Sequence, residues 1–196
     1  MGAASFPPRV TVQITRRDQA VGAVFTAAAI AGLLATIGAL GSGLALMLLV
    51  SFGWWASGRW QMDASRALPR ATIAILVVAA HMAEEFATGF PREFPGLFGN
   101  RPWSDAQFLG VTGTALVVFA FATLGARRGI RLAYLPLFFL ALGGGIANGL
   151  AHLAAAAWRG GYSPGLFTAP LCLIAGAALV AATSTRTPRP HGSGPR

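Results

Sequence analysis

A long stretch without any charge is the feature that most limits what this chain can fold into. Residues 20–58 contain no Asp, Glu, Lys, Arg or His. A helix that crosses a bilayer needs ~20 apolar residues, so this stretch is long enough to cross twice. Gly41-Ser42-Gly43 divides it with residues that favour a turn. We therefore expect two spans, at about 20–40 and 43–57, joined by a tight turn.

Composition places the rest of the chain in the same class. Of its 196 residues, 55% are hydrophobic and only 11% are charged, whereas ~25% charged residues are usual in soluble domains. We predict an all-α, polytopic transmembrane bundle of about six spans, in a single domain at residues 18–183. The N-terminal segment 1–17 is expected to be cytoplasmic or interfacial, and the tail 184–196, rich in Pro, Gly, Ser and Arg, to be disordered. The four further spans are expected at about 71–88, 105–126, 132–157 and 166–183.

The distribution of arginine predicts the orientation of these spans. All fifteen basic residues counted as Lys or Arg are arginines. Twelve of them fall in groups of three before the first span and after the second, fourth and sixth spans, and three, Arg92, Arg101 and Arg159, fall on the other side. The positive-inside rule then places both termini in the cytoplasm. The net charge of +9 is accounted for by topology and lipid headgroups, so no nucleic-acid partner is expected.

The third expected span carries an unusual set of ionisable residues, His81-Met-Ala-Glu84-Glu85. Spacings of three and four residues place the imidazole and the carboxylates on adjoining parts of one helical face. A charged group at bilayer depth costs roughly 2.5 to 3.5 kcal/mol on insertion scales, and such groups usually mark function. The cluster must therefore face the protein interior, a wet cavity or a metal site.

Two other stretches are expected to reach the same depth. Asn148 and His152 share one face of the fifth span, which runs in the same direction as the third. Tyr162-Ser-Pro164-Gly165 then enters the sixth span from the same outer side. The segment 90–103, with its prolines, glycines and aromatics, is expected to be an interfacial loop that could fold back over the cluster.

Two imidazoles and one carboxylate form a recognised metal-ligand set. The combination His2Glu holds catalytic zinc with one open position, and the related facial triad holds non-haem iron(II). We predict His81, Glu85 and His152 as ligands of a divalent metal, with zinc preferred over iron. Spacing alone does not decide which glutamate is the ligand, but His81 and Glu85, one helical turn apart, converge more easily on one ion.

Three further residues are candidates for catalytic roles. The second carboxylate, Glu84, could act as general base on metal-bound water, whose pKa the metal lowers. Asn148 could orient a ligand or polarise a carbonyl, and the Tyr162 hydroxyl could donate to a developing oxyanion.

The three motifs together resemble the HXXEE-domain family of small bacterial integral membrane proteins. The resemblance is carried by His81-Met-Ala-Glu84-Glu85, by Asn148-Gly-Leu-Ala-His152 and by Tyr162-Ser-Pro164-Gly165 with the following Thr168, in that order. It covers roughly residues 71–180. It implies a multi-pass protein of the bacterial cell (inner) membrane and a membrane enzyme that uses a metal, with no particular reaction.

These observations favour a metal-dependent membrane enzyme that acts on a lipid or another apolar small molecule. Hydrolysis by a zinc-bound water is the first choice of reaction and iron-dependent oxidation the second. A metal-free isomerase or cyclase that uses Glu and His as acid and base fits the same residues. A small metal or proton transporter and a purely structural membrane subunit are the competing classes. The sequence does not indicate the substrate or the oligomeric state.

Overall fold

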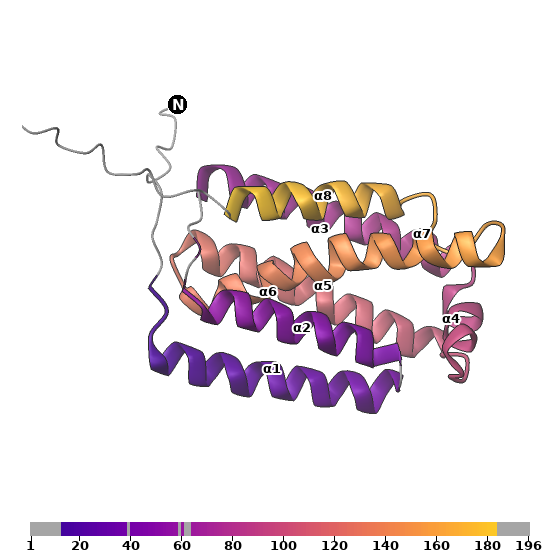
Figure 1. Cartoon of the computed structure of the whole chain (residues 1–196), viewed down its shortest axis with the longest axis horizontal. Coiled ribbons are helices and arrows are strands. Elements are labelled where there is room, and N and C mark those ends of the chain that lie inside the picture. The colour runs from indigo at the N-terminus through magenta and orange to yellow at the C-terminus, as the bar shows by residue number, and fades with distance from the viewer. Residues whose placement is uncertain (1–12, 39, 59, 61–63, 184–196) are drawn as a thin grey trace, which may run out of the picture.

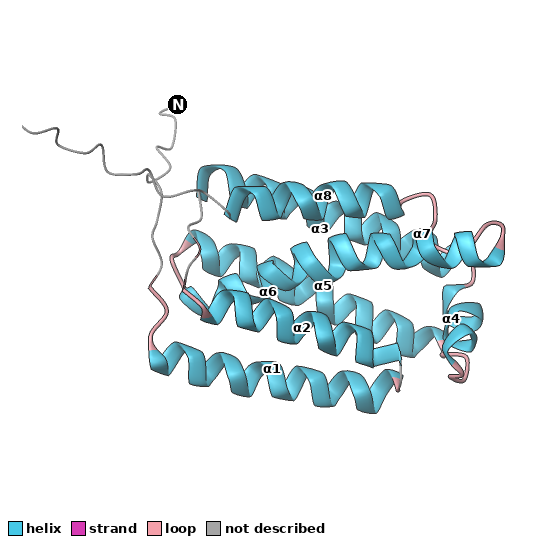
Figure 2. Cartoon of the chain, in the orientation of Figure 1, coloured by secondary structure: helices cyan, strands magenta, loops and turns pink. Residues whose placement is uncertain are grey.

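The computed structural model describes residues 13–38, 40–58, 60 and 64–183. Every regular element in these ranges is a helix, and none of the described residues forms a strand (Figure 2). The predicted all-α class is therefore confirmed for this part of the chain. The expected disordered tail and most of the expected N-terminal segment lie outside the described residues.

The long helices lie side by side, while the short α4 lies at one end of the bundle (Figure 1). α1 packs against α2, α2 against α6, α3 against both α5 and α8, and α7 against α8. The elements are α1 (Arg16–Ile37), α2 (Leu40–Ala56), α3 (Ala64–Ala87), α4 (Phe90–Glu93), η1 (Phe94–Phe98), α5 (Asp105–Arg127), η2 (Arg131–Ala133), α6 (Tyr134–Phe139), η3 (Leu140–Ala147), α7 (Asn148–Arg159) and α8 (Ala169–Thr183).

Several of these helices have the length and composition of membrane spans. The continuous helical stretches that are long and apolar enough to cross a bilayer are Arg16–Ile37, Ser65–Ala87, Asp105–Arg127 and Arg131–Arg159. Gly41–Ala56 and Ala169–Thr183 are apolar but shorter. Four helices of this kind fit a membrane protein, and the count of six spans stays a prediction.

The turn between the first two helices lies earlier than the sequence suggested. α1 ends at Gly38, whose φ of 59° lies in the left-handed region and whose N–H bonds to the carbonyl of Leu34. α2 begins at Leu40, so Gly41-Ser42-Gly43 lies inside a helix and the predicted break there is wrong. The glycine at 38 can adopt the positive φ that ends a helix, and this decides the position of the turn.

The expected loop at 90–103 and the expected fifth span also differ from simple forms. The loop contains two short helices, α4 and η1. The fifth span is helical from Arg131 to Arg159, but its middle, Leu140–Ala147, is a π-helix. π-helical turns are rare and often accompany functional sites.

Glycines in this span allow α8 to approach at backbone distance. A Cβ built on Gly145 would lie 2.6 Å from the Cα of Gly176, and one built on Gly149 would lie 2.6 Å from the carbonyl oxygen of Ala169. Small residues at a helix crossing permit such close contact. The crossing fixes the first half of α8 against α7.

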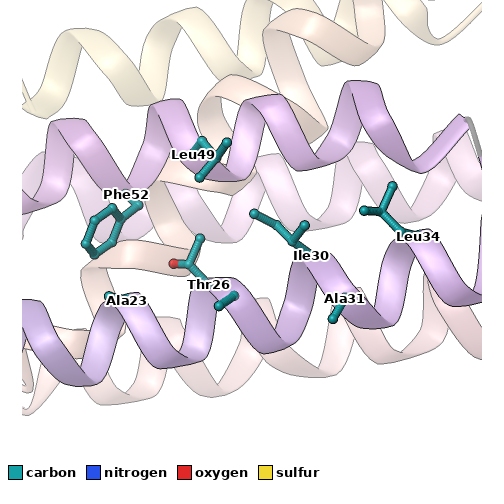
Figure 3. A pocket seen from close by; sticks show the side chains of 8 residues that line it. Ala23, Thr26, Ile30, Ala31, Leu34, Leu49 and Phe52 are labelled. Atoms are coloured by element: carbon teal, nitrogen blue, oxygen red, sulfur yellow. The ribbon is translucent and has the colours of Figure 1, made fainter.

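The α1–α2 hairpin forms an apolar groove. The groove has a volume of about 420 Å³, and the hydroxyl of Thr26 is the one polar side-chain group among the residues that line it (Figure 3). No titratable side chain lines the groove, so it offers no acid, base or metal ligand. The labelled residues are Ala23, Thr26, Ile30, Ala31, Leu34, Leu49 and Phe52.

The glycine crossing gives a first prediction. We expect Gly145→Ala to destabilise the protein by about 1 to 3 kcal/mol, because the added methyl group meets backbone that cannot rotate away. Gly113→Ala is the control, because a Cβ there meets nothing within 4 Å, and it should be neutral or stabilising by about 0.5 to 1 kcal/mol. Thermal unfolding in detergent measures both. Equal Tm values for the two variants would contradict the crossing.

Candidate metal centre

The site lies where the last turns of α3 meet α7. α3 supplies His81 and Glu85, and α7 supplies His152. The two imidazole rings are 4.7 Å apart, centroid to centroid, and nearly perpendicular at 83°. Exposure is 0% for His81, 1% for His152 and 5% for Glu85. The three residues predicted as ligands are therefore brought together in a place shielded from solvent.

The distances among the donor atoms suit a single ion. Oε1 of Glu85 lies 3.0 Å from Nε2 of His152 and 3.5 Å from Nε2 of His81. Each of the three residues offers one donor atom, and these atoms all lie within 4.8 Å of one another. Two ligands at about 2.1 Å from a tetrahedral zinc ion are about 3.4 Å apart. This group could therefore hold a metal ion with small adjustments.

The tautomer of His152 follows from its hydrogen-bond partner. Nδ1 of His152 lies 2.6 Å from the carbonyl oxygen of Pro164. A carbonyl oxygen can only accept, so Nδ1 carries the proton and donates it. In the neutral ring, Nε2 then carries a lone pair, and this lone pair faces Glu85.

The tautomer of His81 follows from a longer chain of hydrogen bonds. The hydroxyl of Thr168 donates to Oε2 of Glu84 at 2.5 Å. The same Thr168 oxygen lies 2.7 Å from Nδ1 of His81, and its single proton is already used. Nδ1 of His81 must therefore be the donor, which leaves a lone pair on Nε2. This Nε2 is buried and has no hydrogen-bond partner.

Three lone pairs thus converge among side chains that are almost fully buried. One proton could bridge His152 and Glu85, but it would leave Nε2 of His81 unsatisfied, at a penalty of about 1 to 3 kcal/mol. A divalent cation satisfies all three acceptors together. Histidine ligands of metals usually donate their other ring N–H to a protein acceptor, as both rings do here.

Glu84, the other carboxylate of the motif, has a different environment. Its Oε1 accepts from the Tyr162 hydroxyl and the Phe167 amide, both at 3.0 Å. Its Oε2 accepts from the Thr168 hydroxyl and from the Thr168 amide at 2.8 Å. Four hydrogen bonds fill the acceptor sites of a carboxylate. Glu84 binds the segment 162–168 and directs no free lone pair at the two histidines.

Tyr162 and Asn148, predicted as catalytic residues, make no hydrogen bond or ion pair with the three predicted metal ligands among the described residues. Tyr162 is 42% exposed and donates to Glu84. Partial burial, together with the neighbouring Glu84 carboxylate, raises the pKa of Tyr162, so the phenol remains a donor at neutral pH. Asn148 is half-buried at the start of α7, and its backbone N–H bonds to the carbonyls of Gly143 and Gly145, while its side-chain amide makes no hydrogen bond within the described part of the chain. The catalytic role of Asn148 stays a prediction.

Residues of the segment 162–168 that were not predicted as site residues contact both histidines. Pro164 and Thr168 provide the acceptors for the two rings. Gly165 has a φ of +86°, and a Cβ there would lie 2.8 Å from atoms of both His81 and His152. Thr168 and the Pro164-Gly165 turn belong to the third sequence motif, so they could have been proposed as site residues. The role of the Pro164 carbonyl could not, because every residue has a backbone carbonyl.

α4 and η1 cover His152 at one end of the bundle (Figure 1). The ring of Phe94 stacks on His152 with centroids 5.1 Å apart, and the ring of Phe90 lies 5.7 Å away. An ion pair between Glu93 and Arg159, 3.2 Å apart, ties α4 to the end of α7. The expectation that this segment folds back over the cluster is therefore confirmed.

In the described part of the chain, the fold and the site together define an all-helical protein with four helices long and apolar enough to cross a membrane and a buried His-Glu-His group that could hold a metal. Comparison with known families gives the narrower class. Residues 72–180 match the family described as protein of unknown function with HXXEE motif, and the chain belongs to this family. No curated protein and no solved structure matches the chain.

The hydrogen-bond pattern predicts the tautomer of both buried histidines. We expect the ring nitrogen signals of both His81 and His152 to show a proton on Nδ1, because each Nδ1 faces an oxygen that can only accept. Nitrogen-15 NMR of histidine-labelled protein in detergent measures this, with His191→Gln to remove the third histidine. An unprotonated Nδ1 on either ring would contradict the arrangement of acceptors.

Proposed function

We propose that this protein is a metal-dependent integral membrane enzyme in which His81, Glu85 and His152 bind one divalent ion. The observation that carries the proposal is the convergence of three acceptors, two of which belong to imidazole rings whose other nitrogen already has a hydrogen-bond partner. Buried polar groups without partners are rare in native proteins, and an orphan such as Nε2 of His81 asks for an explanation. A cation supplies it.

Zinc is our first choice of metal, and hydrolysis our first choice of reaction. The donor separations of 3.0 and 3.5 Å span the value of about 3.4 Å for tetrahedral zinc. Three protein ligands leave a fourth position free for water or substrate, as in zinc hydrolases. When bound, zinc lowers the pKa of a coordinated water to about 7 and polarises a carbonyl oxygen.

The depth of the site supports a lipid or another apolar small molecule as substrate. α3 has 24 residues and His81 lies six residues before its end, which corresponds to a helix of ~36 Å with His81 ~9 Å from the outer end. If α3 spans a hydrocarbon core of ~30 Å symmetrically, His81 lies about 6 Å inside its boundary. We place the protein in the bacterial inner membrane as a multi-pass protein, with the site near the level where acyl chains join headgroups.

Metal content is the direct test of the proposed ligands. We expect about one equivalent of zinc per chain in protein purified without chelators, and strongly reduced zinc in His81→Ala, Glu85→Ala and His152→Ala, because each change removes one of three donors. Mass spectrometry of the metal measures the stoichiometry. His191→Ala, at a position outside the described residues, is the control and should keep its zinc. Wild-type protein that takes up no metal, or ligand variants that keep it, would contradict the proposal.

Activity on lipids tests the proposed reaction. We expect zinc-loaded protein in vesicles to hydrolyse an ester- or amide-linked lipid, and Glu85→Ala to lower the rate by about 100-fold or more, because the metal contributes several kcal/mol to the transition state. Mass spectrometry of the lipid products measures the rate. Zinc flux into proteoliposomes that depends on Glu85, without any lipid product, would assign the site to transport instead.

A further inference from the structure

We infer that Glu84 is a positioning residue that holds the segment 162–168 against the two histidines, and that it is not the general base. The inference rests on the proposed metal site and assigns a task to a residue that the ligand set leaves out. It predicts that Glu84, whose oxygens face the segment 162–168 and not the proposed ligands, affects the affinity of the site for a metal ion.

The contacts of Glu84 all lead to this segment. Its four hydrogen bonds come from Tyr162, from the amide of Phe167 and from the amide and hydroxyl of Thr168. Hydrogen bonds to an ionised carboxylate are stronger than those between neutral groups. One side chain of α3 therefore fastens the start of α8 at several points at once.

The fastened segment in turn orients both imidazoles. The carbonyl of Pro164 accepts from His152, and the hydroxyl of Thr168 accepts from His81. Gly165 lies between these two contacts, close enough to both rings that even a methyl group would not fit. If the segment moved by an ångström, both rings would lose their partners and their present directions. The geometry of the metal site thus depends on the anchor.

The arrangement also separates Glu84 from the role of general base. A general base needs a free lone pair within hydrogen-bond reach of the water that it activates. The lone pairs of Glu84 are directed at Tyr162, Phe167 and Thr168. Glu85, one residue further along the helix, is the carboxylate that faces the histidines.

Glu84→Gln distinguishes the two roles without knowledge of the substrate. The NH2 group of glutamine would face N–H or O–H donors at a position where the carboxylate oxygen accepts, so hydrogen bonds to the segment 162–168 would be lost. We expect the affinity for Zn²⁺ and for Co²⁺ to fall by about 10- to 100-fold, the usual effect of losing a group that supports a metal-binding histidine. The visible spectrum of bound Co²⁺ should change as well. If Glu84 were instead the general base, Glu84→Gln would lower the turnover and would leave the metal affinity and the Co²⁺ spectrum unchanged.

Thr168 provides the matched pair of variants. Thr168→Val removes the hydroxyl that links Glu84 to His81 and should weaken Co²⁺ binding by about 10-fold or more. Thr168→Ser keeps the hydroxyl and should restore wild-type affinity and spectrum. Thr112→Val, in α5, is the control, because that hydroxyl bonds only to its own helix at the carbonyl of Phe108. A Co²⁺ affinity of Thr168→Val equal to wild type would overturn the inference.

A measurement without metal separates this inference from the proposed function. In metal-free protein, amide hydrogen exchange at Phe167 and Thr168 should become faster in Glu84→Gln, because both amides donate to that carboxylate. Unchanged exchange at both amides would overturn the anchor, whatever the metal content. If the wild type binds no zinc or cobalt while exchange does respond, the proposed metal site fails and the anchoring contact stands.

Discussion

Electron pairs of His81, His152 and Glu85 point at one another in a buried region, and the contacts of the surrounding helices hold them in this position. Acceptors that face each other repel, and the repulsion is strong where the surroundings are poorly polarisable. Such an arrangement is stable only if a positive charge lies among them. The proton positions on both rings, deduced from Pro164 and Thr168, make this a property of the whole hydrogen-bond network.

Helix packing explains how two histidines from distant parts of the chain come together. η3 is held to α8 by the crossing of Gly145 with Gly176, and α7 by the approach of Gly149 to Ala169. α3 also packs against α8. Both helices that carry a histidine therefore contact α8. The π-helical stretch Leu140–Ala147, just before α7, contains Gly145 and contacts α8 as well. The direction of His152 is fixed by its own contacts, with Pro164 on one side and Glu85 on the other.

The sequence predicted the part of the site that depends on helical periodicity. His81 and Glu85 are four residues apart and had to share a face, and polar residues in an apolar helix had to avoid lipid. The pairing with His152 followed from topology. Other features depend on contacts that no local pattern records. Gly38 follows the last residue of α1 because its backbone adopts a positive φ, and the π-helix lies against α8. Likewise, nothing in the letters of the chain shows that the carbonyl of Pro164 is the partner of His152.

The two adjacent glutamates show why spacing could place residues at the site without assigning their tasks. Neighbouring residues on a helix differ in direction by about 100°, so Glu84 and Glu85 cannot face the same group. Glu85 shares a face with His81 and points at α7, while Glu84 points at the segment that leads into α8. A helix with both residues can therefore present a ligand in one direction and fasten a support for the other ligands in another. Both carboxylates therefore act on the same two imidazoles. Glu84 orients them through the segment 162–168, and Glu85 faces them directly.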